Sequence, residues 1–454
     1  LRLLPLAPTC VPSAPNFEVS GGDFGPTEIT TLLARPDIHG AAELMTMHQL
    51  LDGDARVQGI VAAGLASGKR VCGHGRGLGG GDLMAYAAAG VETDHELTSA
   101  ADLMARLEAG MTVELRGSHA HLIPEFAEAL IDLGHMPQTL TLCTDDVFPD
   151  DLQNKGGLNH VIAMLIANNI PPAWAYRAAT LNAASRIRRP DLGLVAPGKM
   201  ADLVILSNLR DVTASHVFVG GKLVAKTDGL ITKIKSTPVA PAVLNTVQTK
   251  RFEASCFEVP AKGPVVRIAT LSKPRFPEWG SRDVDAMNGY LLLPDNMIRM
   301  AVCNRYGNNT PTRVAFIENW GTWKGAFATT VSHDSHNLTV FGRDADDMAL
   351  AANTLRDMQG GLAVVADGKV MAKLMLPVAG LISEKPLADV AKEFANLRAA
   401  LDALVDWQPP YLVFKALFGA SLVCNAGPRL SDVGLVDVFA GKILESCVLQ
   451  DGMN

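Results

Sequence analysis

The stretch Lys69-Arg70-Val71-Cys72-Gly73-His74 decides the fold, because it is a short apolar run that ends abruptly in a glycine and a histidine. It predicts a buried β-strand, and the amphipathic segment Asp82–Ala89 that follows predicts a helix. The pattern recurs in Thr112–Arg116, a predicted strand, and Pro124–Leu133, a predicted helix. Strands that alternate with helices pair in parallel and build βαβ units. We therefore predict an α/β fold with a parallel sheet.

This alternation continues over residues 1 to about 190. The predicted strands are Arg2–Ala7, the start of Gly40–Met47, Lys69–His74, Val91–His95, Thr112–Arg116 and Thr139–Asp145. In parallel barrels and in doubly wound sheets, the residues that do chemistry lie at the carboxyl ends of the strands. We therefore expect the functional side chains of this region at those ends.

Gly, Pro and charge patterning divide the rest of the chain. Residues 191–235 predict a small β-sandwich-like unit, in which Ala201–Leu206 is a strand and Gly220-Gly221 forms a turn. Residues 236–262 are rich in Pro, Thr and Lys, which predicts a linker. Residues 263–454 predict a C-terminal domain of the α+β type.

The composition excludes several classes of protein. Of the 454 residues only 19% are charged, and almost half are apolar, so the chain is expected to fold rather than stay disordered. A net charge of −7 without runs of Lys and Arg predicts no nucleic-acid partner. The seven cysteines have no CxxC spacing, and no apolar run is long enough to cross a bilayer. We expect a cytoplasmic homo-oligomer with no membrane partner.

Four side chains stand where predicted strands end: Glu43, His74, His95 and Asp145. The ends of parallel strands meet at one mouth, and two imidazoles with two carboxylates suit Zn, Mn or Fe. A structural interpretation of each residue stays open. A histidine beside a glycine is more often a turn or core residue, and an acidic pair such as Asp145-Asp146 is more often a helix N-cap.

Several motifs together resemble bacterial adenine deaminases, a metal-dependent branch of the amidohydrolases. Gly73–Leu78, followed by Asp82-Leu83 and Ala85-Tyr86, resembles their GHAPGL…DLNAY segment. Gly90–Glu96 resembles AG-x-x-SDHE, and Cys143–Leu152 resembles TDD-x-x-PDDL. Ser332–Asn337 matches the SHDSHN signature of the C-terminal domain of that family. Two further segments resemble the part that closes amidohydrolase barrels: Ala178–Ala184 and Leu192–Val204.

The resemblance implies a fold, a reaction and a set of site residues. The fold is a (β/α)8 TIM-like barrel, incomplete at its N-terminus, in which residues 1–190 supply about strands three to eight. The reaction is hydrolytic deamination of adenine to hypoxanthine and ammonia by metal-activated hydroxide, in purine salvage or adenine catabolism. The implied cofactor is a binuclear divalent centre of Mn, Fe or Zn. Glu43 is expected to bridge or bind the metals, His74 and His95 to bind one of them, and Asp145 to bind the other.

The same resemblance assigns further roles. Asp145 also moves the proton from the hydroxide to the departing ammonia, and Glu43 and Glu96 complete the catalytic set. The residues expected to contact the purine are Arg116, Ser118, His119, Asp146, His333 and His336. A structural or supporting role is an open alternative for each of Glu96, Arg116, Ser118 and His119. For His333 and His336, a polar loop that stabilises its own domain is the structural alternative.

Two other functions stay open at this point. Another amidohydrolase reaction, such as hydrolysis of a cyclic amide, uses a similar site. A non-catalytic scaffold that keeps the fold without metal is also consistent, because the HxH pair of the family is absent. His119-Ala120-His121 is not that pair, since it follows the predicted seventh strand. Phe148, which is often His in the family, and Thr46, which departs from the usual EMMN, favour altered substrate preference.

These departures generate a first prediction. The first two barrel strands and the HxH pair are expected to be missing from residues 1–454, so the sheet stays open and one metal lacks its imidazole ligands. We expect these residues alone, saturated with Mn or Zn, to be inactive or nearly so in an adenine turnover assay. Turnover at the level of a complete family member would show that the strand numbering or the ligand assignment is mistaken.

Overall fold

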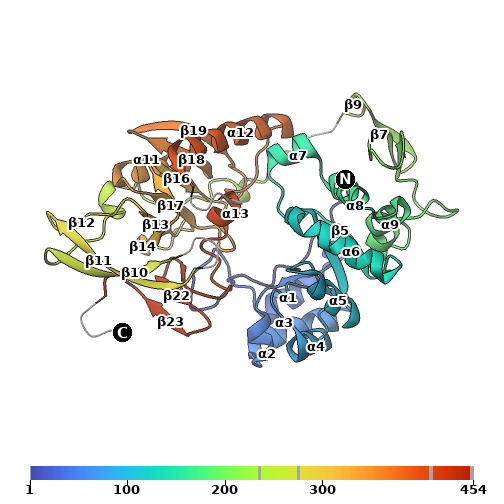
Figure 1. Ribbon diagram of the computed structural model, residues 1–454, viewed down its shortest axis with the longest axis horizontal. Coiled ribbons are helices and arrows are strands. Elements are labelled where there is room, and N and C mark those ends of the chain that lie inside the picture. The colour runs from blue at the N-terminus through green and yellow to red at the C-terminus, as the bar shows by residue number, and fades with distance from the viewer. Residues whose placement is uncertain (1, 234–236, 273–276, 408–412, 450–454) are drawn as a thin grey trace. The chain divides into compact units, whose positions relative to one another are not determined.

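A computed structural model describes residues 2–233, 237–272, 277–407 and 413–449. The chain divides into two compact units. Unit 1 comprises Leu1–Thr9 and Gly25–Thr237, and unit 2 comprises Cys10–Phe24 and Pro238–Asn454. In Figure 1 the elements of unit 1 run from blue to green, and those of unit 2 run from yellow-green to red apart from the blue segment 10–24. The expected domain 1–190 is therefore interrupted by a segment that belongs to the other unit.

Unit 1 is built on short parallel strands that follow one another in chain order. Their bounds are β1 Gly40–Leu44, β2 Arg70–Gly73, β3 Thr93–Asp94, β4 Thr112–Arg116 and β5 Leu140–Cys143. β1 pairs with β2, β3 with β4 and β4 with β5, all in parallel. Ala7, earlier in the chain, forms a parallel bridge with Ala41 of β1. Between β2 and β3, the Glu92 amide donates to Val71 O at 2.9 Å. The predicted parallel α/β architecture is confirmed, although Arg2–Ala7 contributes only a bridge.

The helices of unit 1 lie between these strands in sequence. They are α1 Pro26–Leu33, α2 Met47–Leu51, α3 Ala55–Ala66, α4 Gly80–Ala88, α5 Ala100–Glu108, α6 Ile123–Leu133, α7 Pro149–Lys155, α8 Leu158–Ala167, α9 Pro172–Arg177 and α10 Ala183–Arg186. A 3-10 segment, Gly117–Leu122, follows β4, and a π-helical turn, Ala178–Asn182, joins α9 to α10. Their ends follow local chemistry: the Asp54 carboxylate caps α3 by accepting from the Val57 amide at 2.9 Å, and Gly134, in the left-handed region, ends α6.

The core of unit 1 lies between β4, β5 and the helices that follow them. Leu115 and Leu140 from the strands pack with Phe126 of α6 and Leu165 of α8, and all four are almost fully buried. Burying such side chains stabilises the fold by roughly 1.5–3 kcal/mol each. This packing fixes the strands whose carboxyl ends carry the polar side chains.

A four-stranded antiparallel sheet ends unit 1. Its strands are β6 Leu203–Leu206, β7 Ala214–Val219, β8 Lys222–Lys226 and β9 Gly229–Leu230. The predicted strand Ala201–Leu206 and the turn at Gly220-Gly221 are both present. The structure shows one sheet in the described part of 191–235 rather than a sandwich, and none of its strand residues is fully buried.

Unit 2 contains a nine-stranded sheet in the order β12-β11-β10-β14-β13-β17-β16-β18-β19. The strands are β10 Val265–Leu271, β11 Trp279–Met287, β12 Tyr290–Leu291, β13 Met297–Cys303, β14 Arg313–Glu318, β16 Ala326–Thr329, β17 Leu338–Gly342, β18 Gly361–Ala366 and β19 Lys369–Met375. All neighbours are antiparallel except β10 and β14. The remaining strands are short: β15 Thr322–Trp323, β20 Val405–Asp406, β21 Arg429–Leu430, β22 Leu435–Asp437 and β23 Lys442–Leu444.

Helices cover both faces of this sheet. The helices are α11 Ala345–Asp357, α12 Leu387–Leu404 and α13 Val413–Phe418. Ala326 and Ala328 of β16 share a core with α11 on one face. Phe327, between them, points to the other face because side chains alternate along a strand. There it meets Phe414 of α13 at 5.9 Å between ring centroids, and Phe414 meets Phe394 of α12 at 5.0 Å. No helix in the described parts of the chain is long and apolar enough to span a membrane.

The predicted linker 236–262 differs from what the structure shows for residues 238–262. Phe257 is fully buried and Val247 nearly so, both in the core beside α11. The Phe252 amide donates to the Asn353 side chain at 2.9 Å, and the Asn353 amide group donates back to Phe252 O at 2.8 Å. The linker interpretation is wrong because a few well-spaced apolar residues anchor the segment despite its content of Pro, Thr and Lys.

Glu18 lies on segment Cys10–Phe24 of unit 2, and its burial generates a prediction about stability. Burial raises the pKa of this carboxyl from 4.5 to about 7, against the opposing effect of a hydrogen bond from the Ser13 amide at 2.5 Å. A carboxyl whose folded pKa is raised stabilises the fold below its unfolded pKa, and this stability is lost as the pH rises through the folded value. We expect Glu18→Gln to increase the free energy of unfolding by up to about 3 kcal/mol at pH 8 and to change it little at pH 4.5.

Denaturant unfolding at the two pH values measures this difference. Glu384→Gln, at an exposed glutamate, is the control, and its unfolding curve should equal that of the unmodified chain at each of the two pH values. A Glu18→Gln protein that is no more stable than the unmodified chain at pH 8 would show that Glu18 is not held neutral.

Candidate metal centre

The carboxyl ends of the first three strands bring Glu43, His74 and His95 together. Glu43 lies within β1, His74 directly follows β2, and His95 directly follows β3. Gly73 permits this approach, because a Cβ there would lie 2.2 Å from Thr93 O. The strand-end prediction therefore places these three residues correctly in space, and their roles stay predictions.

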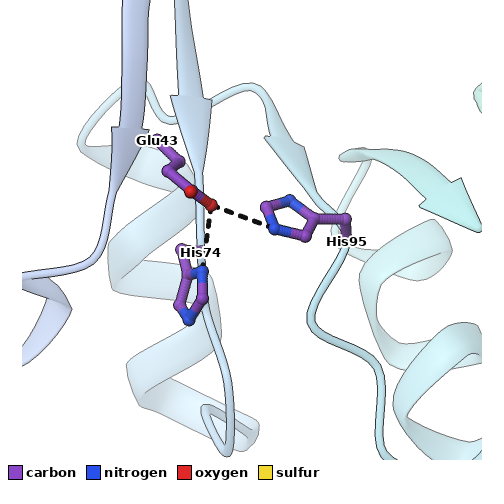
Figure 2. Close-up of side chains that lie close together, drawn as sticks. All are labelled: Glu43, His74 and His95. Atoms are coloured by element: carbon purple, nitrogen blue, oxygen red, sulfur yellow. Dashed lines mark hydrogen bonds and ion pairs between the residues drawn. The ribbon is translucent and has the colours of Figure 1, made fainter. Parts of the chain in front are cut away.

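Figure 2 shows the Glu43 carboxylate between the two imidazoles. Glu43 Oε2 lies 3.0 Å from His74 Nδ1 and 3.0 Å from His95 Nε2. The two rings meet edge to face, with centroids 5.4 Å apart. One atom from each residue lies within 4.8 Å of the other two, which is the spacing of ligands around one ion. Two imidazole nitrogens and a carboxylate oxygen fit Zn, Mn or Fe.

Backbone contacts hold the three side chains. Thr9 Oγ1 donates to Glu43 O at 2.7 Å, and Tyr86 Oη donates to Leu44 O at 2.8 Å. The same Tyr86 oxygen accepts from the His74 amide at 3.1 Å. Tyr86 thus ties the end of β1 to the residue after β2. The sequence showed that Ala85-Tyr86 resembles part of a family motif, but it did not show that Tyr86 links β1 to His74.

The charges of the triad are coupled in the metal-free protein. Burial raises the pKa of Glu43, but hydrogen bonds to His74 and His95 outweigh it and lower that pKa well below its ordinary value. Burial lowers the pKa of His95, and contact with Glu43 outweighs it and raises that pKa to about 9. At neutral pH the His95 imidazolium therefore faces the Glu43 carboxylate, in the place where a cation would bind.

Glu96 lies beside the triad and is enclosed by arginines. Its side chain is 6% exposed, and Oε1 lies 3.8 Å from His74 Nδ1 and 3.9 Å from His95 Nε2. Oε2 accepts from Arg76 Nη1 at 2.7 Å and from Arg116 Nη2 at 3.0 Å. Burial raises the pKa of Glu96, but its interactions with His74, Arg116 and Arg76 outweigh burial and lower that pKa to about 2.

Asp145 is linked to the triad through Arg116 and is not among the three residues with ligand spacing. Its carboxylate oxygen Oδ2 accepts from Arg116 Nη1 and, at 3.1 Å, from Ser118 Oγ. Asp145 has a left-handed backbone (φ 55°), a conformation that Asp tolerates better than most residues, and it turns the chain after β5. Neither Asp145 nor Asp146 caps a helix, since α7 has Phe148 as its N-cap.

The other predicted purine contacts fall in two places. His119, in the segment after β4, is buried, and its Nε2 lies 2.9 Å from Arg116 Nη2, whereas Asp146, after β5, is exposed. His333 and His336 belong to unit 2, in the loop between β16 and β17. The His333 amide donates to Phe418 O at 2.8 Å, and His336 Nδ1 accepts from the Ser332 amide at 3.2 Å. These contacts give the loop a structural role within unit 2, and its contact with substrate stays a prediction.

Known proteins match the chain over both units. The amidohydrolase family matches residues 52–224, and the adenine deaminase C-terminal domain matches residues 276–442. An adenine deaminase 2 of Rhizobium etli is 52% identical over 452 residues, which are 99% of this chain and 76% of that protein. The chain belongs to the adenine deaminase family. The resemblance inferred from the motifs is confirmed.

More distant adenine deaminases align over the same extent. One of Klebsiella pneumoniae is 44% identical over 99% of this chain and 75% of its own length. One of Nitratidesulfovibrio vulgaris is 34% identical over 95% of this chain and 75% of its own length. The chain thus spans about three quarters of the length of these adenine deaminases.

The coupled triad predicts how metal binding depends on pH. The His95 pKa of about 9 means that this imidazole carries a proton at pH 7 in the metal-free protein, and ligation requires the neutral form. We expect Mn²⁺ binding at pH 7 to release about one proton, and the apparent affinity to rise about tenfold per pH unit between pH 6 and 8. Calorimetry in two buffers of different ionisation enthalpy measures the proton release.

His135→Asn, at an exposed histidine, is the control and should leave both results unchanged. His95→Asn should weaken binding and remove the proton release. Binding that is independent of pH over this range would rule out His95 as a ligand.

Proposed function

We propose that the site around Glu43, His74 and His95 carries out hydrolytic deamination of adenine to hypoxanthine and ammonia. The observation that carries the proposal is the triad with metal-ligand spacing in a chain 52% identical to an adenine deaminase. We further propose a binuclear centre of Mn, Fe or Zn, which Glu43, His74, His95 and Asp145 would hold, with His74 and His95 on one ion and Asp145 on the other. When bound, the metal supplies the Lewis acidity that brings the pKa of water toward neutrality.

The residues of the chain then handle the protons. The oxygen of water adds to C6 of adenine, and the exocyclic amino group leaves as ammonia. The Asp145 carboxylate accepts the proton that the water loses and delivers it to the departing nitrogen, which balances the exchange. Glu43, with a pKa held low by its two histidines, stays ionised throughout. The pairing of Asp145 with Arg116 and Ser118 supports a fixed position for this carboxylate.

The other expectations from the sequence remain part of the proposal. We place Glu96 in the catalytic set and His119, Asp146, His333 and His336 among the residues that contact the purine. Ser118, which the sequence also suggested as a purine contact, is assigned instead to holding Asp145, to which it donates. The six parallel segments, in chain order, would be strands three to eight of a closed eight-stranded barrel. A homo-oligomer in the cytoplasm completes the proposal.

A hybrid enzyme tests the function. In it, this chain replaces the matching 452 residues of the Rhizobium etli relative, so that every part of that protein outside the match is present. With Mn, Fe or Zn, we expect the hybrid to release one ammonia for each adenine converted to hypoxanthine, and to leave hydantoins unchanged. Hydantoin opening without ammonia release from adenine would instead establish the cyclic-amide reaction.

The role of Asp145 generates a further prediction. An amide at this position cannot carry a proton and binds a cation weakly, so Asp145→Asn in the hybrid should lower kcat by about 10²–10⁴-fold while the protein stays folded. Asp132→Asn, at an exposed position on α6, is the control and should keep full activity. A loss below about tenfold would show that another group moves the proton.

A further inference from the structure

Each nitrogen of the Arg116 guanidinium lies within hydrogen-bond distance of another side chain. Nη1 donates to Glu96 Oε1 and to Asp145 Oδ2. Nη2 donates to Glu96 Oε2 at 3.0 Å and lies 2.9 Å from His119 Nε2, while Nε lies 3.3 Å from His119 Nδ1. A guanidinium has five N–H donors, one on Nε and two on each Nη. Three of the five are donated to carboxylate oxygens and a fourth to His119, whose neutral imidazole has one acceptor nitrogen, and the side chain is only 8% exposed.

We infer that Arg116 is a positioning residue that holds the Asp145 carboxylate in place for proton transfer, and that it does not bind the purine. The inference rests on the proposed deamination. To donate to a purine with any of these bonded N–H groups, Arg116 would have to give up a bond to Glu96, Asp145 or His119, and the Arg116 side chain is only 8% exposed. Breaking one member of a buried charged network is costly, because it leaves an uncompensated charge.

Two donors meet on the same oxygen of Asp145. Arg116 Nη1 and Ser118 Oγ both donate to Oδ2; Arg116 is the last residue of β4, and Ser118 lies two residues later in the 3-10 segment that follows. Together they fix the rotation of the carboxyl group, and the left-handed backbone of Asp145 sets the direction of its side chain. A proton-transfer group works only when its donor and acceptor atoms are held at hydrogen-bond distance.

The planar fork of arginine is what this arrangement needs. Through Nη1 it joins Glu96 to Asp145, and through Nη2 it keeps the other Glu96 oxygen occupied. Its charge offsets two carboxylates that meet at one nitrogen and would otherwise repel each other. Lysine carries the same charge but is a point donor on a flexible stem, so it cannot span both carboxylates in fixed geometry.

Kinetics of Arg116→Lys in the hybrid test the inference. A positioning role predicts a fall in kcat of about 10²-fold, with KM for adenine and the calorimetric Kd for hypoxanthine both within about threefold of the unmodified hybrid. Arg188→Lys, which changes an exposed Arg–Glu pair with Glu92, is the matched control and should change neither. A Kd for hypoxanthine weakened tenfold or more, or an unchanged kcat, would overturn the inference.

A second variant keeps the test decisive if Arg116→Lys does not fold. Ser118→Ala removes the other Oδ2 donor with little change of volume, and it should lower kcat by a smaller factor, about 3–10-fold, at constant KM. A rise in KM at constant kcat would assign this loop to substrate binding and overturn the inference. If the unmodified hybrid binds hypoxanthine but releases no ammonia from adenine, the proposed function fails, and the Kd of Arg116→Lys for hypoxanthine still decides whether Arg116 binds the purine.

Discussion

The buried ion pair between Asp94 and Arg106 is the interaction on which the geometry of the metal centre depends. Both side chains are fully buried, and Arg106 Nε donates to Asp94 Oδ2 at 2.8 Å. Asp94 Oδ1 accepts from the amides of Gly75 and Glu96, at 3.0 and 2.9 Å, and Arg106 Nη2 donates to Gly75 O at 2.7 Å. One pair thus fastens the residue after His74 to the residues on both sides of His95. Loss of either partner would leave a buried charge uncompensated, at a cost of about 3–5 kcal/mol.

The parallel strands could be predicted because each is a short apolar run that ends in a polar residue, and this pattern depends on nearby residues only. Glu43, His74 and His95 followed from it, since strand ends converge in any parallel sheet. The segment Cys10–Phe24 and the anchor residue Phe257 could not be predicted, because each owes its place to partners far along the chain. Composition carries no information on such contacts.

The same limit explains what the sequence missed in the site. Arg116 holds Glu96, which lies 20 residues earlier, and Asp145, which lies 29 residues later, and neither spacing follows a local rule. An arginine at the end of a strand predicts a substrate contact as readily as a structural one. The hydrogen-bond partners of its guanidinium distinguish the two roles, and these partners depend on the tertiary fold.

Glu96 and Glu43 are two carboxylates beside the same histidines, and their surroundings give them different tasks. Both oxygens of Glu96 accept from arginines, with Arg116 on Oε1 and both Arg76 and Arg116 on Oε2. Glu43 faces the imidazoles instead, and its side chain is 42% exposed. The imidazolium of His95 can lose its proton when a cation binds, which frees the Glu43 carboxylate to contact that cation. The arginines that pair with Glu96 cannot lose a proton, so they stay charged and keep that carboxylate occupied. These surroundings support the proposal that Glu43, rather than Glu96, binds the metal, and they leave Glu96 paired with Arg116.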